Sequence, residues 1–236
     1  LFPLWAVMVG GVLLMFYLYD SYQYRKEECR DLIRDRRRVV PLHMTGTVNF
    51  LWIAGVIAGI FLPFPRREGV LILMAVMSLL TTRRQCRIDN KFNYNPILEV
   101  AILFAGIFVT MVPALLILNA RGAGLGISSP WQFFWMTGSL SSFLDNTPTY
   151  LAFFSMAQGL GLNGDMMGIP TIFLKAISAG AVFMGANTYI GNGPNFMVKV
   201  IAEEYKLKMP SFFGYMVYSF ALLIPLYLVV TLLFFR

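Results

Sequence analysis

The sequences SSFLDNTPT at residues 141–149 and GANTYIGNGPN at residues 185–195 decide the fold of this chain. Both motifs place Asn, Thr, Pro or Gly within apolar surroundings, where a continuous membrane helix would have Leu or Val. Unpaired backbone groups are very unfavourable in hydrocarbon, so interrupted helices persist there only when protein or a water-filled cavity surrounds them. Two such interruptions in one chain point to a transport site. We therefore interpret the motifs as the two tips of one cation site.

The composition indicates an integral membrane protein. The 236 residues are 58% hydrophobic, with a mean hydropathy of +0.67, whereas soluble domains average about 45–50% apolar residues. The net charge of +7 is concentrated in a few loops, as is usual for membrane proteins, so it does not indicate a nucleic-acid partner. A disulfide between Cys29 and Cys86 is not expected if their loops are cytoplasmic.

We expect neither an enzyme nor a cofactor, apart from Na⁺ or H⁺ as coupling or transported ions. His43 is the only histidine, which leaves no histidine-based metal site. The sequence has no phosphate-binding loop and therefore encodes no ATP hydrolysis. An intramembrane aspartyl protease needs two facing aspartates, but only Asp145 lies deep in an apolar segment.

Five apolar stretches are predicted to be full or nearly full transmembrane spans. They cover residues 2–19, 47–62, 70–82, 96–118 and 211–235. Pro63 and Pro65 stop the second span, and Pro96 opens the fourth, at a position where its missing N–H is not needed. The third stretch is short for a crossing, so either flanking polar residues extend it or it tilts within the bundle.

The two stretches around the first motif are too short to cross a membrane. Residues 131–144 and 149–160 form arms of about 12–14 residues, whereas a crossing of the hydrocarbon core needs about 20. Two short arms around a polar tip predict a re-entrant helical hairpin. Residues 171–186 and 195–204 are likewise half-length, and together they predict one broken helix.

The predicted fold class is thus an all-α integral membrane protein with about five full spans, one re-entrant hairpin and one broken helix. We expect scaffold-type spans and cytoplasmic basic loops in residues 1–120, the hairpin and broken helix in 121–210, and a last span in 211–236. The basic segments 25–38 and 83–91 fall on the same side of the membrane. By the positive-inside rule this side is cytoplasmic, and the hairpin then opens from the outside.

The motifs supply the ligands that an alkali cation requires. Unwound helix ends offer backbone carbonyls, while Asn and Thr offer neutral side-chain oxygens. The predicted cation- or substrate-binding residues are Asp145, Asn146, Thr147, Thr149, Asn187, Thr188, Gly191, Asn192 and Asn195. For Na⁺ itself we expect contacts from Asp145, Asn146 and Asn192, with Pro148, Gly193 and Pro194 as structural hinges that hold the breaks open.

Asp145 distinguishes this site from a merely polar one. A carboxylate at bilayer depth is unfavourable unless it is paired, so it exists either as Asp⁻ with a bound cation or as the neutral acid. These two states are what exchange of Na⁺ for H⁺ at one site requires. Asp145 could instead be only the N-cap of the second hairpin arm, and the two roles are compatible.

Two other charged residues have alternative interpretations. Glu99 lies one turn inside a predicted span, where a carboxylate is favoured by the helix dipole or handles protons. Lys199 either extends to the membrane interface or neutralises Glu203 four residues later.

At these motifs the chain resembles the ion-transporter superfamily, which includes carboxylate carriers, sodium/proton antiporters and the membrane subunits of arsenite pumps. The family's carboxylate carriers have Ser-Asn-Thr at the hairpin tip, and the matching residues here are Asp145, Asn146 and Thr147. The tip at 145–148 is closer to the antiporter and arsenite branches. Residues 189–195 match the second motif, x-Ile-Gly-x-x-Pro-Asn. The segments FMVK (196–199) and MPSFFGY (209–215) resemble a bacterial subgroup of citrate transporters or sodium/proton antiporters.

The resemblance covers essentially the whole chain, but only the second half of a family member. Family members contain two inverted repeats, each with one hairpin and one broken helix, so an N-terminal half of the same transporter is expected as a partner. The chain begins at Leu1, without the features of a signal peptide, and we expect a segment before it. The resemblance further implies a multi-pass protein of the bacterial inner membrane, in contact with lipid, with an elevator-like motion and the homodimer usual for the family.

The leading hypothesis is a secondary Na⁺/H⁺ antiporter. The alternative is a Na⁺-coupled symporter for citrate or another carboxylate, because helix N-termini favour anions, although Asp145 repels them. Arsenite efflux is a third possibility within the same class. A non-transporting subunit of a membrane complex is the alternative from another class.

Overall fold

The computed structural model describes residues 1–26, 44–90, 92, 94–164, 166–204 and 206–236. Over these residues the regular elements are helices, and the only strand-like pairing is an isolated bridge between Met166 and Ile169. The chain forms two compact units. The first contains residues 1–26 and 103–236, and the second lies within residues 27–102 and is described from residue 44 onward. Cys29, His43 and most of the predicted basic linker lie outside the described residues.

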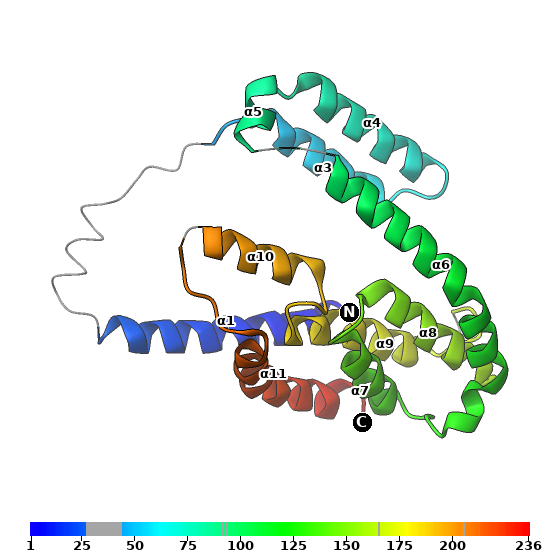
Figure 1. The fold of residues 1–236 in the computed structure, drawn as a ribbon. Helices are drawn as coiled ribbons and strands as arrows, with labels where there is room; N and C mark the ends of the chain where they lie inside the picture. The colour runs from blue at the N-terminus through cyan, green and yellow to red at the C-terminus, as the bar shows by residue number, and fades with distance from the viewer. Residues whose placement is uncertain (27–43, 91, 93, 165, 205) are drawn as a thin grey trace. The chain divides into compact units, whose positions relative to one another are not determined.

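The helices of the first unit follow in chain order (Figure 1). They are α1 (Phe2–Tyr24), the C-terminal part of α6 (Asn95–Arg121), the 3₁₀ helix η1 (Gly122–Leu125), α7 (Pro130–Ser141), α8 (Asn146–Gly159), α9 (Thr171–Phe183), the 3₁₀ helix η2 (Met184–Asn187), α10 (Gly193–Glu204) and α11 (Phe212–Phe234). The second unit contains α3 (Val48–Ile60), α4 (Arg66–Thr81), α5 (Arg84–Asp89) and the start of α6.

Among the described residues, three helices are long and apolar enough to cross a membrane. They are Phe2–Tyr24, Ala101–Arg121 and Phe212–Phe234. The other two stretches predicted as full spans form α3 and α4, which have 13 and 16 residues, fewer than the roughly 20 of a typical crossing. The all-helical class is confirmed over the described residues, with these three helices as candidate membrane spans. The count of five full spans and the architecture of half an inverted repeat stay predictions.

The two predicted arms around the first motif are separate helices. Ser129 and Gln132 form a capping box, and Pro130 opens α7 at a position where its missing N–H is not needed. The chain turns after Ser141, and α8 begins at Asn146, three residues earlier than predicted. The earlier start is possible because Asp145 caps the helix and Pro148 falls in its first turn, where it breaks no helical hydrogen bond.

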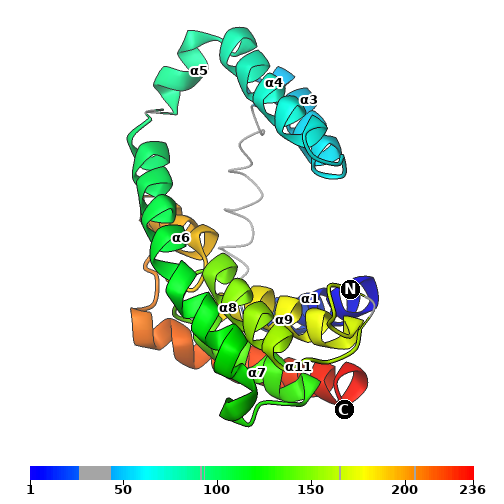
Figure 2. The same cartoon turned by 90° about the vertical axis from the view of Figure 1, so that its right-hand side faces the viewer.

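α7 and α8 pack against α9, as Figures 1 and 2 show. At Gly180 of α9, a Cβ atom would lie 2.4 Å from the carbonyl oxygen of Phe134 in α7. At Gly138 of α7, a Cβ atom would lie 2.0 Å from the sulfur of Met184. These glycines therefore allow the two helix backbones to approach closely, as small residues do in membrane proteins.

α11 completes the core of the first unit and packs along α1. Its Tyr227 is fully buried against the ring of Phe134, with ring centroids 6.2 Å apart. Thr231 accepts a hydrogen bond of 3.0 Å from the indole nitrogen of Trp135 on α7. α11 thus contacts both the hairpin and α1, and it is also the helix predicted as the last span.

The second unit is built on the pairing of α3 with α4. Gly55 and Gly59 form a small-xxx-small pattern on α3. A Cβ atom at either glycine would lie within 3 Å of Met74 or Val70 on α4. At one end of the pair, Asn49 accepts hydrogen bonds from both Ser78 (2.9 Å) and Thr82 (2.8 Å).

Candidate functional site

The second motif is a true interruption of the helix. α9 tightens into η2, residues 188–192 are not helical, and α10 starts at Gly193. Such an interruption leaves backbone carbonyls without partners inside the helix. Hydroxyl groups of α11 satisfy three of them: Tyr227 donates to Phe183 O (2.9 Å), Tyr215 to Ala186 O (2.9 Å) and Ser219 to Asn187 O (2.6 Å).

The end of α7 is hydrogen-bonded to this interruption. The amide nitrogen of Asn187 donates to Ser142 Oγ at 2.9 Å, and the hydroxyl of Thr188 donates to the carbonyl oxygen of Ser142. One turn earlier on α9, Ala181 O accepts a 2.6 Å hydrogen bond from the hydroxyl of Ser141. The two predicted tips are therefore in direct contact, and the pairing occurs where the hairpin turns.

Two glycines permit this contact. A Cβ atom at Gly191 would lie 2.7 Å from Ser142 O and 2.8 Å from Ser141 O. A Cβ atom at Gly185 would lie 2.6 Å from the side-chain amide of Asn146 and 3.1 Å from the carbonyl oxygen of Gly191. Real Cβ atoms do not approach backbone oxygens as closely as the Cβ at residue 191 would, so only glycine at this position allows the turn and the interruption to touch.

Asn146 links the two motifs through its side chain. With the amide turned so that its nitrogen faces acceptors, that nitrogen lies 2.8 Å from Ala181 O and 3.3 Å from Gly191 O. The residue is half-buried and begins α8. It therefore holds the N-terminus of α8 beside the interruption of the neighbouring helix.

Asp145 occupies the N-cap position of α8 and is half-buried. Its Oδ1 accepts a 2.9 Å hydrogen bond from the backbone N–H of Asn146, and its carbonyl oxygen accepts one from the hydroxyl of Thr149. A carboxylate at this position is also favoured by the helix dipole. The N-cap role considered from the sequence is thus present, and it uses only one of the two carboxylate oxygens.

The buried polar side chains of the second motif are largely occupied by internal hydrogen bonds. Asn187 donates to Ser142 and accepts from Tyr227 (3.0 Å). The hydroxyl of Thr188 donates to Ser142 O and accepts from the backbone N–H of Gly191 (2.9 Å). These predicted ligands hold the two tips together, so their oxygens are poorly placed to serve an ion as well.

Other predicted ligands keep free oxygens. Asn195 uses its amide nitrogen to bond Gly185 O (3.2 Å) and Thr188 O (3.1 Å), which leaves its side-chain oxygen available. Within the described part of the chain, the side chains of Asn192 and Thr147 form no hydrogen bond. Asn192 is half-buried and directly precedes α10, while Thr147 is exposed in the first turn of α8.

The predicted hinge residues lie at the two helix starts that face the site. Pro148 is in the first turn of α8, and Gly193 and Pro194 are the first residues of α10. Proline at such positions removes an N–H that has no helical partner. The N-terminal ends of two short helices and the C-terminal ends of two others therefore meet in one region.

A cavity of about 210 Å³ opens beside the start of α8. Its lining residues are Asn146, Thr147, Tyr150, Ser178, Ala181 and Val182. The polar part of this wall carries neutral oxygens, which suit a monovalent cation or a small neutral or weakly charged solute. Among the described residues, no cluster of three or more His, Cys, Asp or Glu side chains is present.

Five hydroxyl residues of this arrangement were not anticipated from the sequence. They are Ser141 and Ser142 at the end of α7, and Tyr215, Ser219 and Tyr227 on α11. The α11 residues recur at intervals of four and eight, which places them on one face of a helix. That spacing is a detectable signal of a polar face turned toward a partner.

The remaining charged predictions have separate outcomes. Lys199 forms an ion pair with Glu203, with Nζ and Oε1 2.7 Å apart, as the second interpretation of this lysine expected. Cys86 is a free thiol. The side chain of Glu99 lies outside what the structure describes, so its role stays a prediction.

Residues 1–66 and 64–235 of the chain match a protein family described as "Putative citrate transport". The chain belongs to this family. The resemblance to citrate-transporter-like proteins of the ion-transporter superfamily is thereby confirmed. Together with the three long apolar helices, the membership identifies the chain as a membrane-embedded protein of a transporter family. Neither a curated protein nor a solved structure matches the chain.

Proposed function

We propose that this protein is a secondary active transporter that exchanges Na⁺ for H⁺ at the hairpin tip. Asp145 is the carboxylate that holds either the cation or the proton. The observation that carries the proposal is the pairing of the turn at Ser142 with the interruption at Asn187 and Thr188. This pairing supports a fixed polar site between two short helix pairs, which is the arrangement that transporters use for coupling ions.

The roles proposed for the ligands follow from which oxygens are free. Asp145 retains one carboxylate oxygen, and Asn192 retains its whole amide. Asn146 follows Asp145 in sequence, its amide lies 3.3 Å from the carbonyl oxygen of Gly191, the residue before Asn192, and it lines the cavity. In this proposal Na⁺ binds the free oxygens of these three residues, while the other polar side chains of the motifs keep the site in shape.

In this proposal Na⁺ and H⁺ compete because both bind the carboxylate of Asp145. A bound Na⁺ favours the ionised form of Asp145, whereas a proton on the free oxygen removes the charge and the main attraction for Na⁺. Each ion therefore expels the other. We expect the apparent affinity for Na⁺ to fall as the pH is lowered.

The test is Na⁺-driven proton flux in proteoliposomes with Asp145→Asn. Asparagine is as good an N-cap as aspartate, so the variant should fold while its flux falls to that of protein-free vesicles. Asp20→Asn, at an exposed position on α1, serves as the control and should keep the wild-type flux. Wild-type flux in Asp145→Asn would eliminate the antiporter proposal.

A Na⁺-coupled symporter for citrate or another carboxylate is the second candidate. The family description supports it, and the N-termini of α8 and α10 would attract an anion. Its signature is uptake of radiolabelled citrate that depends on a Na⁺ gradient and survives Asp145→Asn. Arsenite efflux, the third reading, would appear instead as arsenite accumulation in inverted vesicles.

We further propose that the chain functions as one half of an inverted-repeat transporter in the bacterial inner membrane, with its basic loops in the cytoplasm. The hairpin and the broken helix supply one half-site, and an N-terminal half or a second copy of the chain supplies the other. Native mass spectrometry of the protein in lipid nanodiscs tests this directly. A monomer with full transport activity and no partner would exclude it.

A further inference from the structure

A second cavity, remote in sequence from the motifs, lies within the second unit. It has a volume of about 440 Å³. Its lining residues are Thr82, Arg84, Arg87, Ile88, Phe92 and Tyr94. These residues come from the end of α4, from α5 and from the segment before α6, so the cavity is formed by one continuous stretch of chain.

The charge of this cavity is unbalanced. Arg84 makes no hydrogen bond or ion pair with any described residue, and Arg87 donates only to the carbonyl oxygen of Leu79. The nearest acidic residue in sequence, Asp89, accepts a 2.7 Å hydrogen bond from Gln85. Two guanidinium groups on the wall of one cavity, with no carboxylate among its described lining residues, attract an anion.

The position of the cavity relative to the apolar helices favours a membrane-surface ligand. The indole nitrogen of Trp52 donates a 2.8 Å hydrogen bond to the hydroxyl of Thr81, the last residue of α4. Beside it, Asn49 bonds the hydroxyls of Ser78 and Thr82. Trp is enriched at the membrane–water interface, and here its indole nitrogen lies among polar side chains at one end of an apolar helix pair.

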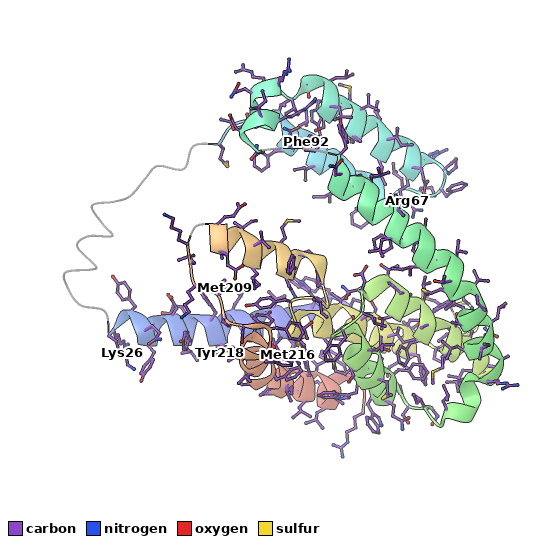
Figure 3. The ribbon with its side chains drawn as sticks, viewed as in Figure 1. Lys26, Arg67, Phe92, Met209, Met216 and Tyr218 are labelled. Carbon is purple, nitrogen blue, oxygen red and sulfur yellow. The ribbon has the colours of Figure 1, made fainter. Side chains whose placement is uncertain are left out.

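The remaining wall of the cavity is apolar and aromatic. The rings of Phe92 and Tyr94 meet edge to face with centroids 5.1 Å apart, and Ile88 lines the cavity with them. Figure 3 labels Phe92 in this segment and Arg67 at the opposite end of the α3–α4 pair. A site for free phosphate would need only the arginines, whereas an apolar wall also fits the glycerol and first methylenes of a lipid.

We propose that this cavity binds the phosphate of an anionic phospholipid. Arg84 and Arg87 contact the phosphate oxygens, in the planar geometry that guanidinium groups match. The aromatic wall contacts the apolar part of the same lipid. The site anchors the second unit at the headgroup level of the membrane, independently of which ion or solute the protein transports.

The test measures retention of phosphatidylglycerol and phosphatidylcholine by native mass spectrometry of the full chain. We expect the wild-type protein to prefer phosphatidylglycerol and the double variant Arg84→Gln/Arg87→Gln to lose about tenfold in that preference. Arg66→Gln/Arg67→Gln removes the same charge at the opposite end of the α3–α4 pair and should keep it. Equal loss in both variants would overturn the proposal, because it would indicate nonspecific charge.

Two further measurements cover the other outcomes. Glycerol 3-phosphate and citrate are added as competitors, and displacement of phosphatidylglycerol by either at millimolar concentration would assign the site to a soluble anion and overturn the lipid proposal. If the double variant does not fold, the proposal is tested by hydrogen exchange of the wild-type protein in nanodiscs with and without phosphatidylglycerol. Phosphatidylglycerol should slow exchange in residues 82–94 and leave residues 61–69 unchanged, and the absence of this difference would overturn the proposal.

Discussion

The hairpin turn and the interruption of the neighbouring helix are both polar, but they use their polar side chains in different ways. In the interruption, Asn187 and Thr188 are buried and each makes two hydrogen bonds. In the turn, Asp145 and Asn146 are half-buried, and Thr147 is exposed at the edge of a cavity. Asn187 and Thr188 hold the structure together from within, whereas the residues of the turn are partly open to their surroundings.

This difference separates two demands that are merged in the sequence. A broken helix must satisfy its backbone and side-chain polar groups internally, because hydrocarbon offers no partners. An ion site must instead keep some oxygens unoccupied until the ion arrives. The structure meets the first demand mainly with residues 187–188, and we infer that residues 145–147 and 192 meet the second.

The largest effect is expected where the two motifs touch. In Gly191→Ala, the new Cβ atom would lie within 3 Å of the carbonyl oxygens of Gly185, Ser141 and Ser142. Backbone cannot move aside cheaply, so we expect a loss of about 3 kcal/mol in unfolding free energy. Gly193→Ala is the matched control, because a Cβ atom there meets nothing within 4 Å. Thermal unfolding in detergent measures the stability of both variants. Equal unfolding midpoints would contradict the close contact between Gly191 and the turn at Ser141 and Ser142.

A smaller effect is expected when a buried polar partner is removed. Asn187→Ala leaves Ser142 and Tyr227 without their shared amide, which should lower the unfolding free energy by about 2 kcal/mol. Asn192→Ala removes a side chain with no described hydrogen bond and should change stability by less than about 0.5 kcal/mol while weakening Na⁺ binding. Urea unfolding and Na⁺-dependent flux are measured on both variants. If Asn192→Ala lowered stability more than Asn187→Ala did, and Asn187→Ala weakened Na⁺ binding more, the proposed roles of the two residues would have to be exchanged.

A further, weaker effect is expected on α11. Tyr227→Phe removes the hydroxyl that serves Phe183 O and Asn187, at an expected loss of about 1 kcal/mol. Tyr218→Phe, on the same helix but 63% exposed, should be neutral. The thermal unfolding midpoints of the two variants test this expectation. An unchanged midpoint in Tyr227→Phe would show that water or another group replaces the hydroxyl.

The smallest effect is expected at the ion pair of α10. Lys199 and Glu203 are four residues apart and partly exposed, so Lys199→Gln should cost about 0.5 kcal/mol or less. The effect should shrink further in high salt, because salt screens exposed pairs. A large, salt-independent loss of thermal stability would mean that Lys199 does more than pair with Glu203.

The positions of the breaks could be predicted from the sequence because they depend on local chemistry. Pro148, Gly191 and Pro194 stand beside Asn and Thr residues that also disfavour a continuous apolar helix, and Asp145 is a strong N-cap. Proline alone does not decide, because Pro113 and Pro225 lie inside α6 and α11. The helix ends around both motifs therefore lie within a few residues of their predicted positions. Length could be predicted less well, since the start of α3 is tied to the end of α4 by the pairing of Asn49 with Thr82, and that contact is not local.

The division of labour within the site could not be predicted from the sequence. Asn187 and Asn192 are the same residue type, five positions apart, in equally polar surroundings. Whether either amide is occupied depends on what lies opposite it in space, and for Asn187 this is Tyr227, forty residues further along the chain. Neither propensity nor periodicity reports such a contact.

The three hydroxyls of α11 have a mechanical consequence. Separation of α11 from the broken helix would break the hydrogen bonds to Phe183 O, Ala186 O and Asn187 O. A lipid environment offers no donors that could replace them. We therefore expect the broken helix and α11 to move together as one rigid body. If parts of this protein move relative to one another during transport, the sliding interface must therefore lie at a place other than the contact between these two helices.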